Sequence, residues 1–208
     1  MFIAFALQSK VLKFGEFTLK SGRISPYFFN AGLFNSGNQL ATLADYYAQK
    51  IAQSNIKYDI LFGPAYKGIP LVAAISIVLA FKYDIDIPYA FDRKEVKAHG
   101  EGGVFVGADM TDEKVLLVDD VMTAGTAFYE SYNKLKTINA EIAGVVLSID
   151  RQEKAKDSDI SATKKISQDF NIPVLAVTNF ESIFEYVKEN LDQEMINKFK
   201  DYREKYGS

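Results

Sequence analysis

The sequence of 208 residues predicts an α/β fold, a central parallel sheet flanked by helices with a small N-terminal hood. Residues 115–118 are four consecutive apolar residues without alternation, as expected of a parallel strand covered on both faces. Short apolar runs also alternate with longer runs at helical spacing, which indicates strands joined by helical crossovers. Near the N terminus, two short aromatic runs flank a turn and predict a hairpin, which would form a hood over the carboxyl edge of the sheet.

The individual elements follow from the same patterns. Ile3, Leu7 and Val11 recur at helical spacing, and the hairpin joins aromatic runs over 14–19 and 27–30. The core then alternates as a helix over about 37–54, a strand over 59–62, a helix over 69–81, strands over 88–91 and 115–119, a helix over 125–137, a strand over 142–149, a helix over about 158–170 and a strand over 174–177. Closing helices are predicted from residue 180 onward.

Length and composition favour a single domain over residues 1–208. With 48% hydrophobic residues and 16 Phe, the chain can bury one sizeable core. The predicted parts are a hood over about 1–36, a core over about 37–178 and C-terminal helices over about 179–208.

Composition also excludes several classes of protein. A net charge of -3 argues against a general polyanion binder. The absence of cysteine excludes disulfides, thiolate metal sites and a cysteine nucleophile, and a single histidine excludes a site with several histidine ligands. The apolar N terminus lacks a basic leader and a cleavage site, and the longest apolar run, 69–81, is shorter than the ~20 residues of a membrane span. A cytoplasmic protein is the simplest interpretation.

An acidic pair and a turn of small residues follow the strand at 115–119. Asp119 and Asp120 stand at its carboxyl end, where α/β proteins bind ligands. The turn from Thr123 to Thr126 has no bulky side chain, so backbone amides and the next helix N terminus can face one anion. Carboxylates beside a phosphate cradle repel a bound phosphate ligand unless they face hydroxyl groups elsewhere on that ligand or a bridging Mg²⁺. The combination predicts a sugar phosphate.

These segments are open to other interpretations. Taken alone, the acidic pair is as often structural as functional, and it also resembles the Mg²⁺-binding strand of P-loop NTPases. That class needs Gly-Lys-Ser/Thr after its loop, whereas Gly68 is followed by Ile69 and Pro70. In the loop from Arg93 to about Gly103, basic residues lie beside clustered glycines, which fits either a mobile lid over a polyphosphate or a solvated hairpin tip. A dinucleotide fingerprint there would need glycine at Phe105.

Five further segments, together with the acidic pair, resemble orotate phosphoribosyltransferases of the bacterial type. The segments are 14–23, 25–30, 62–68, 93–103 and 148–153. The resemblance runs from near the first residue to the C-terminal helix, and it implies a type I phosphoribosyltransferase fold. It further implies transfer of the phosphoribosyl group from phosphoribosyl diphosphate (PRPP) to orotate in UMP biosynthesis, giving orotidine 5'-monophosphate and pyrophosphate. The resemblance also implies Mg²⁺ as cofactor, bound through the pyrophosphate of PRPP, and a homodimer.

The resemblance and the residue chemistry assign site residues together. Those matching the family's PRPP site are Lys20, Tyr66, Lys67, Arg93, Lys94, Lys97, His99, Asp119, Asp120, Val121, Met122, Thr123, Ala124, Gly125, Thr126 and Ala127. Of these, Lys97, His99, Asp119 and Asp120 are the candidate catalytic residues. In the family, the lid that carries Lys97 and His99 reaches the neighbouring subunit's site.

The orotate site is expected at Phe28, Phe29, Thr123 and Arg151. Arg151 follows a strand and offers a planar fork suited to a carboxylate, which orotate has. The alternative is an exposed arginine paired with Asp150 or Glu153. If the segment is extended, Phe28 and Phe29 point to opposite sides, so one can cover the pyrimidine while the other joins the core.

Two rival functions remain open from the sequence. A purine-type phosphoribosyltransferase would share the donor site, although Arg151 and the aromatic hood favour orotate. A noncatalytic PRPP sensor that regulates transcription should carry a DNA-reading module or a basic face, and the N-terminal helix and hairpin supply neither. Neither nucleic acid nor membrane is expected as a partner.

Overall fold

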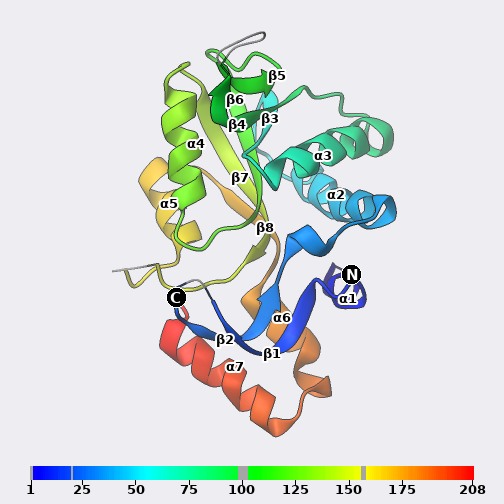
Figure 1. Ribbon diagram of the computed structural model, residues 1–208, viewed down its shortest axis with the longest axis vertical. Helices are drawn as coiled ribbons and strands as arrows, with labels where there is room; N and C mark the ends of the chain where they lie inside the picture. Colours follow the sequence, from blue (N-terminus) through cyan, green and yellow to red (C-terminus); the bar gives the residue numbers. More distant parts are fainter. Residues whose placement is uncertain (1, 20, 98–102, 156–157) are drawn as a thin grey trace.

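The computed structural model describes residues 2–19, 21–97, 103–155 and 158–208, without the side chains of residues 96 and 97 (Figure 1). The elements in chain order are α1 (Phe2–Gln8), β1 (Leu12–Thr18), β2 (Ile24–Phe29), the 3-10 helix η1 (Ala31–Leu33), α2 (Gly37–Ala52), β3 (Ile60–Gly63), α3 (Gly68–Tyr83), β4 (Tyr89–Lys97), β5 (Gly103–Gly107), β6 (Lys114–Val121), α4 (Thr126–Lys136), β7 (Glu141–Asp150), α5 (Ala162–Phe170), β8 (Val174–Asn179), α6 (Phe180–Val187), the 3-10 helix η2 (Lys188–Asn190) and α7 (Gln193–Tyr206).

The central sheet has the strand order β5-β4-β3-β6-β7-β8. The pairs β4-β3, β3-β6, β6-β7 and β7-β8 are parallel, which confirms the predicted parallel sheet. The edge strand β5 is antiparallel to β4 and was not predicted. The segment 93–103, expected as a loop, is therefore strand at both of its described ends. Its charged residues hid this, because they show neither an apolar run nor alternation.

Both faces of the sheet are covered by helices, as the unbroken apolar strands predicted. Leu116 and Val118 of β6 pack in one core cluster with residues of α2 and α3. Val115 and Leu117 point to the opposite face and pack in a second cluster with residues of α4 and α5. Figure 1 shows these two helix pairs on opposite sides of the sheet.

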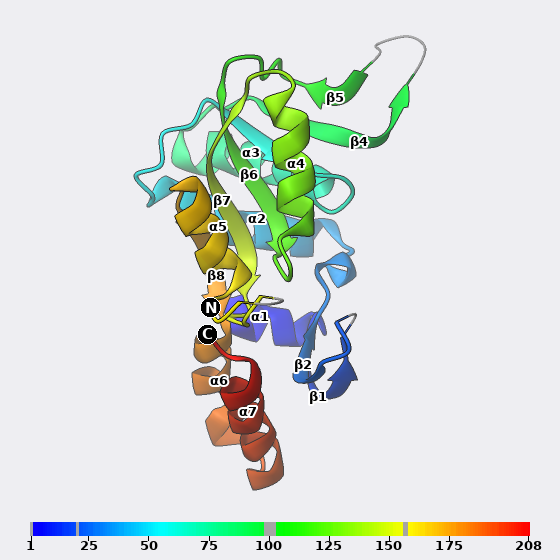
Figure 2. The same ribbon diagram turned by 90° about the vertical axis from the view of Figure 1, so that its left-hand side faces the viewer.

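The N-terminal hood is the antiparallel hairpin β1-β2 together with α1 and η1. Its residue Tyr27 is fully buried, with its ring centroid 5.9 Å from that of Phe180 in α6 and 6.1 Å from that of Phe199 in α7. The hood and the C-terminal helices thus share the core cluster of α2 and α3. Figure 2 shows both at the end of the sheet from which α6 leaves β8, which is the carboxyl end.

Some predicted helix ends differ from the structure. α1 ends at Gln8, so Val11 lies beyond the helix, although it is fully buried as an apolar residue should be. α5 begins at Ala162 rather than at about 158, because Ser161 caps it by accepting a hydrogen bond from the Lys164 amide. No helix within the described ranges is long and apolar enough to cross a membrane.

Candidate active site

The acidic pair lies at the carboxyl end of β6 and is fixed by hydrogen bonds. The Asp120 amide donates to Oδ1 of Asp119 at 2.9 Å. From α2, the buried hydroxyl of Tyr47 donates to the backbone oxygen of Asp119 at 2.8 Å and lies 2.6 Å from Oγ of Ser148 in β7. Tyr47 therefore ties the end of β6 to its neighbouring strand. This support joins residues far apart in the chain, so no local sequence pattern indicated it.

Burial of Asp119 changes its ionisation. Burial raises the pKa of Asp119 to about 7, and the negative charge of Asp120 adds to the rise. The Asp120 amide and the ammonium of Lys67 act in the opposite direction and favour the carboxylate. Asp119 therefore changes charge near neutral pH, and its ionised form, which accepts hydrogen bonds, is fully present only above this range.

This raised pKa gives the first prediction. Between about pH 4 and pH 7 the folded protein keeps a proton on Asp119 that the unfolded chain has lost, so the contribution of Asp119 to stability falls as pH rises. Asp119→Asn removes that penalty. At pH 8 we expect the free energy of unfolding of the variant to exceed that of the parent. At pH 5 this difference should be smaller by about 2–3 kcal/mol. Urea unfolding at both pH values measures it, and an equal gain at both would contradict the raised pKa.

Lys67 lies beside the acidic pair, as expected for groups at the ends of neighbouring strands. It follows β3, and its Nζ is 2.5 Å from Oδ2 of Asp120. The lysine side chain is half exposed, whereas that of Asp120 is 11% exposed. The predicted pyrophosphate cation and the predicted ribose carboxylate thus form an ion pair in the structure. A bound diphosphate would have to compete with Asp120 for this lysine.

The loop between β3 and α3 is tightly wound and anchored by a residue that sequence reasoning missed. A Cβ on Gly63 would lie 2.2 Å from the backbone oxygen of Gly68, so both positions require glycine. Asp92 of β4 is 4% exposed and accepts a hydrogen bond from the Ala65 amide at 2.6 Å. It also forms an ion pair with Lys134 of α4. One buried carboxylate therefore connects the loop that carries Lys67, the base of the β4-β5 hairpin and the helix α4 that follows β6.

The turn after β6 is the segment that the sequence predicts as a phosphate cradle. Thr123 and Ala124 are exposed, and Gly125 adopts φ +76°, a conformation that favours glycine. Gly125 is the N-cap of α4 and makes no side-chain cap, so the amides of the first turn face no capping side chain. Thr126 and Ala127 are exposed in that first turn. The arrangement suits an anion.

The basic residues of the predicted lid lie in β4 or beyond it. Arg93 is half-buried and Lys94 is exposed, and both belong to β4, which projects with β5 beyond the helix-covered part of the sheet (Figure 2). The backbone of Lys97 ends β4, but its side chain lies outside the described residues, as do His99 and Lys20 entirely. The roles expected of these three residues therefore stay predictions. Tyr66 is described and is 70% exposed in the β3-α3 loop.

The aromatic pair of β2 divides as the alternation predicted. Phe29 packs against the core, with its ring 6.4 Å from Phe2 and from Phe34. Phe28 is 37% exposed and stacks on Phe17 of β1 at 5.5 Å. Of the two, Phe28 therefore remains accessible to a ligand.

Arg151, at the carboxyl end of β7, is 6% exposed, so the alternative of an exposed arginine is wrong. It does pair with Glu153, whose Oε1 accepts from its Nε at 2.6 Å. Nη2 donates to Oγ of Ser25 at 3.2 Å and to the hydroxyl of Tyr202 at 3.3 Å, and the guanidinium lies 4.4 Å from the ring centroid of Tyr27. The arginine is buried because the hood and α7 close over the end of β7.

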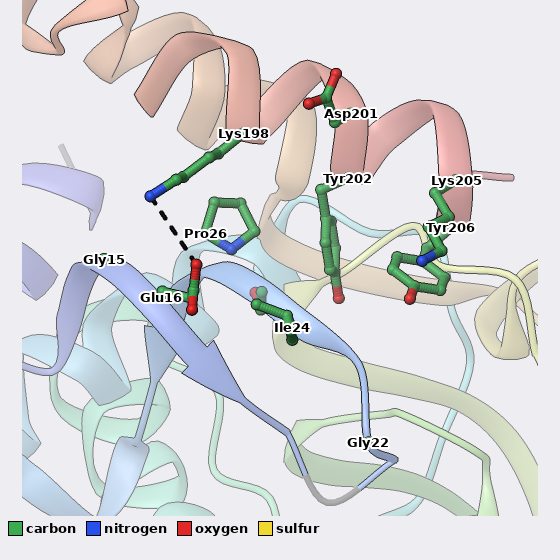
Figure 3. A pocket seen from close by; sticks show the side chains of 11 residues that line it. Gly15, Glu16, Gly22, Ile24, Pro26, Lys198, Asp201, Tyr202, Lys205 and Tyr206 are labelled. Atoms are coloured by element: carbon green, nitrogen blue, oxygen red, sulfur yellow. Dashed lines mark ion pairs between the residues drawn. The ribbon is translucent and has the colours of Figure 1, made fainter. Parts of the chain in front are cut away.

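A cavity of about 320 Å³ borders this cluster between the hairpin and α7 (Figure 3). Ser25 and Tyr202, both partners of Arg151, line it, and Lys198 and Glu16 lie 4.0 Å apart at its other end. Asp119 and Asp120 do not line it. The cavity therefore adjoins the Arg151 cluster rather than the acidic pair.

Comparison with known proteins decides the family. The family model of the phosphoribosyl transferase domain matches residues 33–177. An orotate phosphoribosyltransferase of Photobacterium profundum is 51% identical over 207 residues, which covers 99% of this chain and 96% of the relative. The chain belongs to the orotate phosphoribosyltransferase family. The family's enzyme from Hahella chejuensis is 52% identical over 209 residues, with 99% of this chain and 95% of the relative covered. A crystal structure of orotate phosphoribosyltransferase from Francisella tularensis is 85% identical, with a TM-score of 0.92 and full coverage of both chains.

Proposed function

We propose that the protein transfers the phosphoribosyl group of PRPP to orotate, giving orotidine 5'-monophosphate and pyrophosphate in the biosynthesis of UMP. Membership of the orotate phosphoribosyltransferase family carries this proposal. The geometry supports it, because a rigid acidic pair lies directly before an open turn and an uncapped helix N terminus. Such a site suits a ligand that has both hydroxyls and a phosphate.

In the proposed reaction, the bond between the anomeric carbon and pyrophosphate breaks as the base nitrogen forms its bond to that carbon, and the proton of this nitrogen passes to water. Positive charge develops on the sugar and negative charge on the leaving group. Asp119 and Asp120 accept hydrogen bonds from the ribose hydroxyls, hold the ring and stabilise its cationic character. Their positions are set before the substrate binds, since Tyr47 fixes the strand end. The turn over residues 123–127 holds the 5'-phosphate.

The leaving pyrophosphate is assigned to the basic groups around the acidic pair. Lys67 forms an ion pair with Asp120, and Arg93 and Lys94 lie in β4, on the other side of β3 from the acidic pair. Lys97 and His99 are expected to complete this set from the lid. The described residues hold no cluster of three or more His, Cys, Asp and Glu for a metal ion, but Asp119 and Asp120 are the hard oxygen donors that Mg²⁺ prefers. Bound to the diphosphate, Mg²⁺ would neutralise its charge.

Recognition of the base is assigned to Arg151 and the hood. The arginine supplies a charge-assisted hydrogen bond for the carboxylate, and accessible Phe28 can lie against the pyrimidine.

Comparing several bases as acceptors tests the assignment to orotate. With PRPP and Mg²⁺ present, we expect turnover of orotate and little turnover of adenine or hypoxanthine. Preference for a purine would transfer the assignment to the purine-type enzymes.

A homodimer is proposed on the basis of the resemblance and of one apolar surface. On α3, Phe81 is 90% exposed and Ile77 is 57% exposed, four residues apart on the same helix face. A second copy that covers this face would bury both side chains. The resemblance to the family further implies that the dimer brings the lid of one subunit to the site of the other.

Sharing of the lid gives a prediction by complementation. Lys97→Ala and Asp120→Asn each inactivate different parts of the proposed site. After subunit exchange, a mixed dimer has one site with both defects and one site with neither, so activity should rise clearly above that of either parent. Activity of mixed and unmixed samples at equal concentration measures it. If mixed dimers form but gain nothing, the lid serves its own subunit.

A further inference from the structure

The carboxyl end of β7 carries a buried polar cluster that the proposed reaction leaves unexplained. Besides Arg151, it contains Glu153, which has a 10% exposed side chain and accepts three hydrogen bonds. Its Oε1 accepts from Nε of Arg151 at 2.6 Å and from the hydroxyl of Tyr202 at 2.8 Å. Its Oε2 accepts from Nη1 of Arg23 at 3.2 Å. Glu153 therefore joins β7, the hood and the C-terminal helix α7 at one point.

The cluster fixes the orientation of the Arg151 guanidinium. Nε is held by Glu153, and Nη2 is held by Ser25 and Tyr202. Nη1 has no hydrogen-bond partner among the described residues. In those ranges, the fully buried side-chain atoms that lack a partner are Tyr27 Oη and Arg203 Nη1. Nη1 of Arg151 is not among them, so this atom is not fully buried. Because the guanidinium is planar and rigid, fixing two nitrogens directs the third.

We propose that Glu153 and Tyr202 are positioning residues, which hold Arg151 so that its Nη1 edge meets the carboxylate of the base. This inference rests on the proposed function, since it needs Arg151 to read that carboxylate. It makes the C-terminal helix, which lies far from the acidic pair in the chain, part of base selection. Holding Arg151 in place before the base binds should strengthen binding, because ordering a mobile arginine on binding costs free energy.

Tyr202→Phe is the sharpest test. It removes one hydroxyl that touches both Glu153 and Arg151 and keeps the ring that packs against Phe180. We expect kcat/KM for orotate to fall about tenfold, the effect of one hydrogen bond to a charged group, while kcat/KM for uracil and KM for PRPP stay unchanged. Tyr206→Phe is the matched control, because its ring also lines the cavity but its hydroxyl is outside the cluster (Figure 3).

Two further variants separate positioning from folding. Glu153→Gln keeps an oxygen for Nε of Arg151, so it should lose less orotate selectivity than Glu153→Ala. In an Arg151→Ala background, Tyr202→Phe should change the orotate-to-uracil ratio no further. Thermal melting of each variant shows whether it is folded.

The outcomes distinguish this proposal from the one on which it rests. Loss of orotate selectivity in Tyr202→Phe but not in Tyr206→Phe supports it. If Arg151→Ala abolishes the selectivity while folded Tyr202→Phe and Glu153→Gln retain it, Arg151 reads the carboxylate without their help and the positioning role is wrong. If Arg151→Ala also retains the selectivity, the assignment of Arg151 to the carboxylate fails, and the positioning role fails with it.

Discussion

Neutralising the acidic pair should lower kcat strongly while the fold survives. Asp119→Asn and Asp120→Asn each remove a charge that is proposed to act on the sugar in the transition state, a loss worth on the order of 10²-fold in rate. For Asp119 the fold should even gain stability above neutral pH, because its charged form is disfavoured by burial. Steady-state kinetics with saturating orotate and PRPP measure the effect.

Glu130→Gln is the matched control for this pair, since Glu130 is an exposed carboxylate of α4 close to the same turn. Circular dichroism checks that each variant is folded. A normal kcat in the double variant Asp119→Asn/Asp120→Asn would remove both residues from the mechanism.

Removal of Arg151 should reduce both stability and base selection. Arg151→Ala leaves the buried carboxylate of Glu153 without its nearest partner, and breaking a buried ion pair in this way costs about 3 kcal/mol. Separately, kcat/KM for orotate should fall by an amount equivalent to ~1.5–3 kcal/mol, the contribution of a hydrogen bond to a charged group. The first effect follows from burial of the arginine, which sequence alone did not indicate.

Urea unfolding and kinetics at saturating PRPP separate the two effects. Lys164→Ala, at an exposed position of α5, serves as the control and should change neither. If the stability of Arg151→Ala equals that of the parent, the cluster around Glu153 does not exist in solution as described.

The sequence predicted the parts of the fold that depend on local pattern. The apolar run at 115–118 correctly indicated a strand covered on both faces, because burial on two sides leaves no polar alternation. Glycine at 125 and the small residues before it correctly indicated a turn into a helix. The strand ends of 93–103 were missed because they pair with each other as the two sides of a hairpin, and the charged sequence there shows neither an apolar run nor alternation.

The candidate site shows the same division. Topology alone explains why Lys67 lies beside Asp119 and Asp120, since the carboxyl ends of neighbouring parallel strands meet at one edge of the sheet. Asp92 and Tyr202 could not be predicted, because each acts through a contact with a residue at least 27 positions away. The only local sign of Asp92 was an acidic residue at a strand end beside Arg93.

The most direct test of the central claim is a turnover measurement on the unmodified protein. With Mg²⁺, orotate and PRPP, orotate consumption and pyrophosphate release should proceed at equal rates, and both should stop when PRPP is left out. Transfer to the base makes the two rates equal, since each broken bond at the anomeric carbon releases one pyrophosphate. Release of pyrophosphate without consumption of orotate, or turnover of a purine in its place, would contradict the account.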